Sequence, residues 1–288
     1  MNMNPTEVKV QQQLVARPAS DGAGVKLLRV FGGAQLERFD PFLMLDEFGS
    51  DQAADYIAGF PAHPHRGFET VTYMLQGKME HRDHLGNVGL LADGGVQWMT
   101  AGKGIIHSEM PKQTEGRMHG FQLWVNLAAE RKLIPAHYQD IAAEDIPWQQ
   151  FTGFSVKAIA GAIKVNDIQL QGFFSIADTE VIYLDISLAP QQSISLPITE
   201  QLNAMLYSYS GAIRIGSVGT LNKEKTLSLL TGSGSLIITN NNNEEAKFLF
   251  IAGKPLRQPI KQYGPFVMNT AAEIEQAIHD YQNGVLTS

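Results

Sequence analysis

Short apolar segments, separated by turn-forming residues, recur along the whole chain. The first half contains three that are rich in β-branched and aromatic residues, at 70–75, 96–101 and 121–127. The second half contains four more, at 181–188, 205–215, 235–239 and 247–253, and an asparagine run at 240–243 predicts a turn. Short strands with frequent turns, without alternating long helices, favour a β-sandwich or barrel over a parallel α/β sheet. The pattern therefore predicts an all-β fold.

One helix is predicted, near the C-terminal end. Thr270 and Glu273 have the spacing of a capping box, and Gly284 fits the end of the helix. Between them runs one apolar stripe, formed by Ile274, Ala277, Ile278 and Tyr281. This short helix is therefore expected to serve as packing structure, with His279 on its surface.

The chain has 288 residues, which suggests about two domains. A mixed segment at 136–145 is followed by Ile146, Pro147 and Trp148, where we place the junction. The expected domains are therefore residues 1–145 and 146–288.

Composition excludes several classes of function. The chain is 44% hydrophobic and 18% charged, with a net charge of −7 and no basic block, which argues against direct binding of nucleic acid. No segment approaches membrane-spanning length, and residues 1–13 lack the apolar stretch of a secretory signal, so a cytoplasmic protein is expected. Because there is no cysteine, any metal must be bound through nitrogen and oxygen.

Histidines gather in the first half, and two pairs have strand spacing. His63 and His65 alternate around Pro64, which suits an edge strand, and His107 and Glu109 repeat the i, i+2 spacing. On neighbouring strands the two pairs would place three imidazoles and one carboxylate around a single point. That set suits a divalent first-row metal such as Fe, Co, Ni, Cu or Zn. One H-x-H alone is a weak signal, and the second pair strengthens it.

The other histidines are weaker candidates. His81 and His84 precede a turn, where a solvated hairpin is the simpler interpretation. His119 could line a pocket or be an ordinary hydrogen-bonded core residue. His137 lies near the junction and has no paired neighbour.

These residues resemble the motifs of the cupin superfamily of small β-barrels. The first cupin motif is matched by His63, His65, Glu69 and Gly77, and the second by Gly104 and His107. The chain resembles the two-domain pirin family still more closely, through HPHRGFETV (63–71), QWMTAGKGIIHSEMP (97–111), QLWVNL (122–127) and KPLRQPIKQYGPFVMNT (254–270).

The pirin resemblance implies a fold and a ligand set. It implies two cupin-type barrels of the double-stranded β-helix or jelly-roll kind, packed together. Residues 1–145 would form the metal-binding cupin domain and residues 146–288 a cupin-like domain without metal ligands. A generic cupin would use Glu69 as its carboxylate ligand, and Glu69 also has the right parity in its strand. Pirins take the carboxylate from the second motif, so the resemblance selects Glu109 and leaves Glu69 a supporting role.

The resemblance also implies an activity. Pirins resemble quercetin 2,3-dioxygenases, oxidoreductases in which a metal-bound flavonol is cleaved by O₂ with release of carbon monoxide. Glu109 would remove the proton of the flavonol 3-hydroxyl. Fe(II) is the expected metal, with Zn, Mn, Co, Ni and Cu as alternatives. Apolar walls are available from Phe60, Trp98, Met99, Phe121 and Trp124, although core packing is the simpler role for most aromatic residues in strands.

Two other functions remain open. Pirins are also linked to regulation through protein partners, and eukaryotic members act in the nucleus as transcriptional cofactors. In that case the metal would be structural or redox-sensing. A third reading is another metal-dependent reaction, such as an isomerisation, because the cupin fold supports many chemistries.

Overall fold

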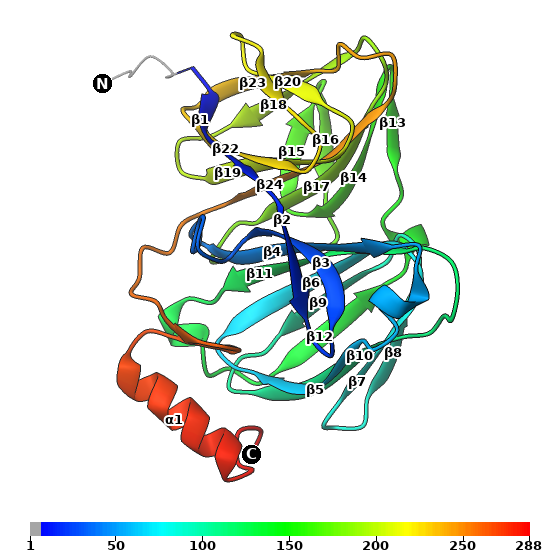
Figure 1. Ribbon diagram of the computed structural model, residues 1–288. Helices are drawn as coiled ribbons and strands as arrows, with labels where there is room; N and C mark the ends of the chain where they lie inside the picture. The colour runs from blue at the N-terminus through cyan, green and yellow to red at the C-terminus, as the bar shows by residue number, and fades with distance from the viewer. Residues whose placement is uncertain (1–6) are drawn as a thin grey trace. The chain divides into compact units, whose positions relative to one another are not determined.

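The chain forms two compact units in this computed structural model, which describes residues 7–288 (Figure 1). The unit that carries the clustered histidines, here called the histidine unit, consists of Arg17–Ala143 and Leu256–Ser288. The second unit consists of Glu144–Pro255 and the N-terminal strand up to Ala16. Residues 1–6, which form part of the stretch examined for a secretory signal, lie outside the described residues.

Each unit therefore contains a terminal segment from the other half of the sequence. The units change between Ala143 and Glu144, close to the junction predicted from sequence. Strand β1 (Lys9–Val15) nevertheless pairs with β22 (Thr226–Thr231) of the second unit. The C-terminal hairpin and helix, coloured orange to red in Figure 1, pack with the histidine unit. Pairings between such distant segments are not visible in local sequence patterns.

The histidine unit contains two antiparallel sheets and a C-terminal attachment. The larger sheet has the order β12 (His137–Ile141), β9 (Val96–Thr100), β6 (Phe68–Gln76), β11 (Met118–Asn126), β4 (Phe42–Ser50), β3 (Val25–Phe31) and β2 (Arg17–Asp21). The smaller sheet has the order β5 (Phe60–His65), β10 (Ile105–Pro111), β7 (Met79–Asp83) and β8 (Val88–Leu91). The attachment is the hairpin of β25 (Lys261–Tyr263) and β26 (Phe266–Met268), followed by α1 (Ala271–Gln282).

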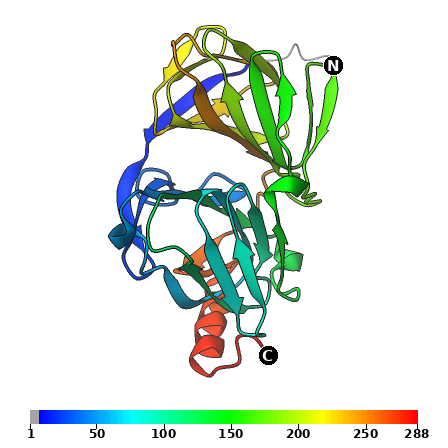
Figure 2. The same cartoon turned by 90° about the vertical axis from the view of Figure 1, so that its right-hand side faces the viewer.

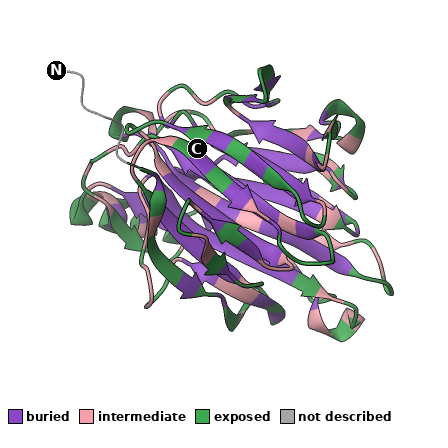
Figure 3. Cartoon of the chain, turned by 90° about the horizontal axis from the view of Figure 1, so that it is seen from above, coloured by how far each residue is buried: buried purple, intermediate pink, exposed green. Residues whose placement is uncertain are grey.

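Side chains from both sheets share one core, as a jelly-roll barrel requires. Met74 of the larger sheet packs in one cluster with Met79 and Leu91 of the smaller sheet. Short 3₁₀ turns occur at η1 (Ala53–Asp55), η2 (Ala129–Arg131) and η3 (Ala143–Asp145). Figure 2 shows the same chain from the side, and Figure 3 shows buried residues following the strands.

The second unit repeats the two-sheet plan. Its larger sheet has the order β1, β22, β19 (Asn203–Ser210), β24 (Ala246–Gly253), β17 (Ile182–Leu188), β14 (Phe154–Ala160) and β13 (Gln149–Phe151). Its smaller sheet has the order β18 (Ser193–Ile198), β23 (Gly234–Thr239), β20 (Ile213–Ile215) and β21 (Thr220–Asn222), and β15 (Ala162–Val165) pairs with β16 (Ile168–Gln171). Apolar side chains from both sheets, such as Leu184 and Ile238, form its core.

The all-β prediction is confirmed, with one correction to the strands. The apolar segment 205–215, predicted as one strand, is divided between β19 and β20. Gly211 lies between them with a φ of 72°, a left-handed conformation that turns the chain and favours glycine. The two pieces join different sheets of the second unit. The apolar pattern alone does not distinguish this corner from a continuous strand.

The predicted helix is confirmed as α1. Its N-cap Thr270 and Glu273 form the capping box, and Ile274 and Ala277 are buried against the hairpin and the end of the chain. His279 is exposed, as expected. Within residues 7–288, no helix is long and apolar enough to cross a membrane.

Candidate metal centre

Two neighbouring strands of the smaller sheet bring the paired motifs together. Strands β5 and β10 run antiparallel, with His63 opposite His107 and His65 opposite Ile105. Strand β5 is the sheet edge, so Pro64 can occupy it without removing a required backbone hydrogen bond. His107 and Glu109 are both buried, and Ser108 between them is less so, as the alternation predicted. A register shift separates the pairings of His107 and Glu109 with β5.

Three imidazoles converge in a geometry suited to a metal ion. The Nε2 atom of His63 lies 3.0 Å from Nε2 of His65 and 3.0 Å from Nε2 of His107. Two nitrogens at right angles around an ion, with bonds of about 2.1 Å, would be separated by about 3.0 Å. The ligand atoms of all three lie within 4.8 Å of one another, and no other such group occurs within residues 7–288. Three protein ligands leave positions open for further ligands on a five- or six-coordinate ion.

Burial favours the neutral form of two of these histidines, His65 and His107. It lowers the pKa of His65 and of His107 well below the usual value for an imidazole, and the neighbouring imidazoles lower both further. The ring of His65 also packs against Phe68 and Trp124, at centroid distances of 5.1 and 5.4 Å. Neutral imidazole is the form that donates a lone pair to a metal. The electrostatics of the site therefore agree with its geometry.

Glu109 lies beside this trio but is hydrogen-bonded elsewhere. Its Oε1 accepts a hydrogen bond from Thr72 at 3.1 Å, and its Oε2 accepts one from the Gln122 amide at 3.1 Å. The side chain is buried and is not among the three residues that can share one ion. Glu109 as the fourth ligand therefore stays a prediction.

Glu69, the alternative carboxylate, is hydrogen-bonded within its own sheet. It is buried on β6, and its Oε1 accepts a hydrogen bond from the Thr100 hydroxyl at 2.7 Å. Burial raises its pKa. It does not belong to the group of three potential ligands. Its place on the neighbouring sheet suits a supporting role.

The interpretation of His81 as part of a solvated hairpin is wrong. This residue is 2% exposed, and its Nε2 lies 2.8 Å from Nδ1 of His107. Strand β7 pairs with β10, and its alternation turns Met79 and His81 inward while Arg82 faces out. Had Met79–Asp83 been predicted as a strand, its alternation would have placed His81 on the inward face. The same interpretation is confirmed for His84, which is exposed beyond the end of the strand.

The two later histidines of this region do not join the centre. His119 is buried and forms a 2.7 Å contact through Nε2 with Oε1 of Glu47, which confirms the hydrogen-bonded core alternative. His137 is exposed, and its Nδ1 lies 3.3 Å from the carbonyl oxygen of Pro135.

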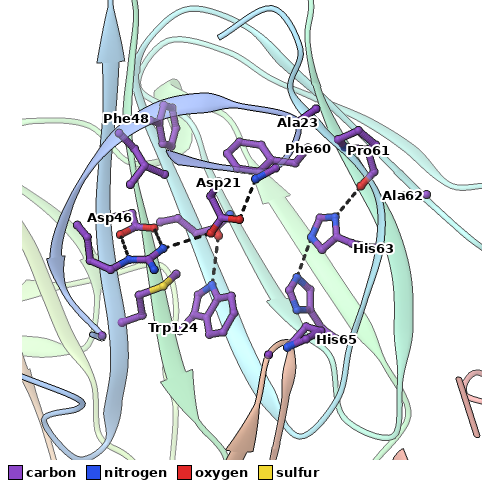
Figure 4. A pocket seen from close by; sticks show the side chains of 18 of the residues that line it. Asp21, Ala23, Asp46, Phe48, Phe60, Pro61, Ala62, His63, His65 and Trp124 are labelled. Atoms are coloured by element: carbon purple, nitrogen blue, oxygen red, sulfur yellow. Dashed lines mark hydrogen bonds and ion pairs between the residues drawn. The ribbon is translucent and has the colours of Figure 1, made fainter. Parts of the chain in front are cut away.

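A cavity of about 620 Å³ opens onto two of the histidines, His63 and His65 (Figure 4). Of the five expected wall residues, Phe60 and Trp124 line it. The other three, Trp98, Met99 and Phe121, are buried and do not line this cavity. Gln122 also lines it and accepts a hydrogen bond from the Trp124 indole at 3.1 Å. Cavities of this size take small organic molecules.

Comparison with known protein families shows to which family the chain belongs. The sequence matches the family model described as Pirin over residues 24–125 and the Pirin C-terminal cupin domain over residues 183–287. The chain belongs to the pirin family. Both barrels are therefore of the cupin type, as the sequence motifs implied.

Pirins with similar sequences come from bacteria and animals. A Pseudomonas aeruginosa protein named "Putative quercetin 2,3-dioxygenase" is 53% identical over 271 residues, which cover 93% of this chain and 94% of that protein. Human Pirin is 40% identical over 278 residues, which cover 96% of this chain and 92% of human Pirin. A crystal structure of quercetin 2,3-dioxygenase from Acinetobacter baumannii matches with a TM-score of 0.87 and 32% identity. The match covers 98% of this chain and 99% of that chain.

Proposed function

We propose that this pirin is a metal-dependent dioxygenase of the quercetin 2,3-dioxygenase type. The observation that carries the proposal is the convergence of three imidazoles, two of which line a cavity large enough for a flavonol. The names of the P. aeruginosa relative and of the A. baumannii structure support the same activity.

The three histidines would hold the metal, with Glu109 as a fourth ligand. A bound divalent ion, for which we propose Fe(II), would supply Lewis acidity toward a substrate oxygen and redox chemistry with O₂. Zn, Mn, Co, Ni and Cu are the alternatives, and elemental analysis of the purified protein decides among them.

Glu109 is our candidate for the group that takes the proton of the substrate hydroxyl. Its Oε2 accepts a hydrogen bond from Gln122, and Gln122 lines the cavity. The Gln122 side chain therefore separates this oxygen from a substrate in the cavity. Exchange of that hydrogen bond for one from the substrate would bring the carboxylate within reach of the proton. Gln122 is itself positioned by the Trp124 indole. The aromatic walls exclude water and orient a flat substrate.

The test is oxygen-dependent loss of quercetin, with release of carbon monoxide, by protein of measured metal content. His63→Ala and His107→Ala should each abolish turnover and lower the metal content. His84→Ala is the matched control, because His84 is exposed and should leave both unchanged. If turnover survives in both histidine variants, this centre does not carry the activity.

One outcome would favour the regulatory function instead. The chain is similar to human Pirin over nearly all of its length. Stoichiometric metal with no turnover of any flavonol, together with reproducible binding of one protein partner, would assign the metal a structural or redox-sensing role.

A further inference from the structure

An ion-paired row of side chains forms another part of the wall of the same cavity. Asp21, at the end of β2, Arg29 on β3 and Asp46 on β4 all line it. Arg29 donates from Nε to Oδ1 of Asp46 at 2.9 Å and from Nη2 to Oδ2 of Asp46 at 2.8 Å. Nη2 also lies 3.2 Å from Oδ2 of Asp21. The larger sheet thus holds the row in place, because Arg29 and Asp46 are opposite each other in its register.

The row retains hydrogen-bonding capacity that faces the cavity. A carboxylate has about four lone-pair sites, and Asp21 uses two, for Arg29 and for the Gly22 amide at 2.8 Å. Asp46 likewise accepts two hydrogen bonds, both from Arg29. The Nη1 group of Arg29 donates to no atom of residues 7–288. The row therefore offers several acceptors and one pair of donors to a ligand.

The exposed fraction of the side chain increases along the row, from Asp46 through Arg29 to Asp21. The Asp46 side chain is 4% exposed, that of Arg29 is 30% exposed and that of Asp21 is 52% exposed. Asp46 is thus the anchor, and Arg29 and Asp21 are the members that a ligand can reach. Hydrogen bonding to Asp46 raises the pKa of Arg29, so its guanidinium stays charged. Two carboxylates and one guanidinium leave an excess negative charge, which disfavours an anionic group at this place.

Apolar side chains adjoin the row and line the rest of the cavity. Phe48, Phe60, Trp124 and Met44 all contribute to its walls. Figure 4 shows Asp46 and Phe48 on the side of the pocket away from His63 and His65, with Asp21 and Trp124 between them and the histidines. A ligand that reaches from the histidines to the row would therefore have a flat apolar body and a polar far end.

We propose that Asp21 and Arg29, anchored by Asp46, form a second recognition subsite that binds vicinal hydroxyl groups on an aromatic ring of the substrate. This proposal rests on the proposed function, in which the other end of the substrate lies at the histidines. One hydroxyl would donate to the Asp21 carboxylate, and its neighbour would accept from Nη1 of Arg29. A ring without hydroxyls would leave these groups unpaired as it displaces their water, and a ring bearing a carboxylate would meet the excess negative charge.

The flavonols quercetin and galangin provide a matched pair of probes. Quercetin has two vicinal hydroxyls on its lateral ring, whereas galangin has none. Their dissociation constants should be measured by calorimetry on the full metal-loaded chain without oxygen, and quercetin turnover in air should be measured in parallel. We expect the wild-type protein to bind quercetin about tenfold more tightly than galangin.

Asp21→Asn tests the subsite with little structural change, because Asp21 is half-exposed and asparagine keeps an acceptor for Arg29. We expect this variant to lose most of the preference for quercetin and to bind galangin as the wild type does. Arg29→Lys, which keeps the charge but removes the second donor group, should also lower the preference. Asp51→Asn is the control, since Asp51 is an exposed ion-pair partner of Arg117 and does not line the cavity.

Equal binding of the two flavonols by the wild-type protein would overturn the subsite, as would a preference that persists in both Asp21→Asn and Arg29→Lys. If the protein turns over quercetin but does not prefer it to galangin, the subsite proposal is wrong and the proposed function stands. A preference that depends on Asp21, without turnover, removes the dioxygenase proposal and keeps the subsite. If quercetin does not bind at all, both proposals fail.

Discussion

The Nε2 atom of His81 lies 2.8 Å from the Nδ1 atom of His107, and both rings are buried. The other ring nitrogen of His107 faces His63. For His107 to bind a metal through Nε2, its proton must be on Nδ1, where His81 can accept it. His81 is therefore placed to select the tautomer of His107 that binds metal.

Replacement of His81 by alanine should weaken metal binding without removing a ligand. Partners that orient ligating histidines contribute about 10- to 100-fold to metal affinity, and we expect a loss in that range. Competition with a chelator of known affinity measures it. His84→Ala, in the adjacent turn, should keep the wild-type affinity. Equal affinity in the His81→Ala and wild-type proteins would contradict this role.

The metal-free protein should become less stable as the pH falls below about 6.5, the usual histidine value. The pKa values of His65 and His107 are lowered in the folded state. Below about pH 6.5 the unfolded chain therefore binds more protons than the folded chain. Stability should therefore rise with pH between pH 5 and 6, by up to about 2.7 kcal/mol per pH unit for the two histidines together. Urea unfolding at several pH values measures the slope.

The double variant His65→Gln, His107→Gln is the comparison for this slope. Glutamine does not titrate, so the variant should have a flatter dependence of unfolding free energy on pH. Parallel curves for the two proteins would show that acid sensitivity arises elsewhere.

Glu109→Gln separates ligand binding from proton transfer. The three imidazoles remain, so the variant should still bind metal, with lower affinity. Quercetin turnover should fall by about 10²- to 10⁴-fold, the usual contribution of a general base. Glu115→Gln, which alters an exposed carboxylate, should have wild-type turnover. Near-normal activity in Glu109→Gln would remove this residue from the mechanism.

Asp280 on α1 should matter for stability, because it pairs with a buried arginine next to a candidate ligand. Nη1 of Arg66 lies 2.7 Å from Oδ2 of Asp280, Nη2 donates to the Leu286 carbonyl at 3.1 Å, and the Arg66 side chain is 7% exposed. Asp280→Ala leaves this charge without its carboxylate and should cost about 2 kcal/mol in unfolding free energy. Chemical denaturation measures it. Glu275→Ala, on the exposed part of the same helix, should change stability by less than about 0.5 kcal/mol.

Local patterns were sufficient to predict the convergence of the three histidines. The i, i+2 spacing of His63 and His65 has a direct meaning in a strand, and Pro64 indicated an edge. His81 was missed because the polar residues around it suggested a turn, although its strand continues to Asp83. The hydrogen bonds of Glu109 depend on Thr72 and Gln122, which lie on the other sheet. Partners across sheets are set by tertiary packing, which spacing along one strand does not encode.

The distribution of the chain between the two units has a consequence for its synthesis. Leu256–Ser288 leave the ribosome only after the whole second unit has been made, yet they belong to the histidine unit. They include Asp280 and Leu286, the partners of Arg66, the residue that follows His65. The candidate metal centre therefore gains its full support only late in translation, when its own strands have long been complete. A nascent chain that stalls before residue 256 would carry all three histidines without the segment that fixes their neighbour.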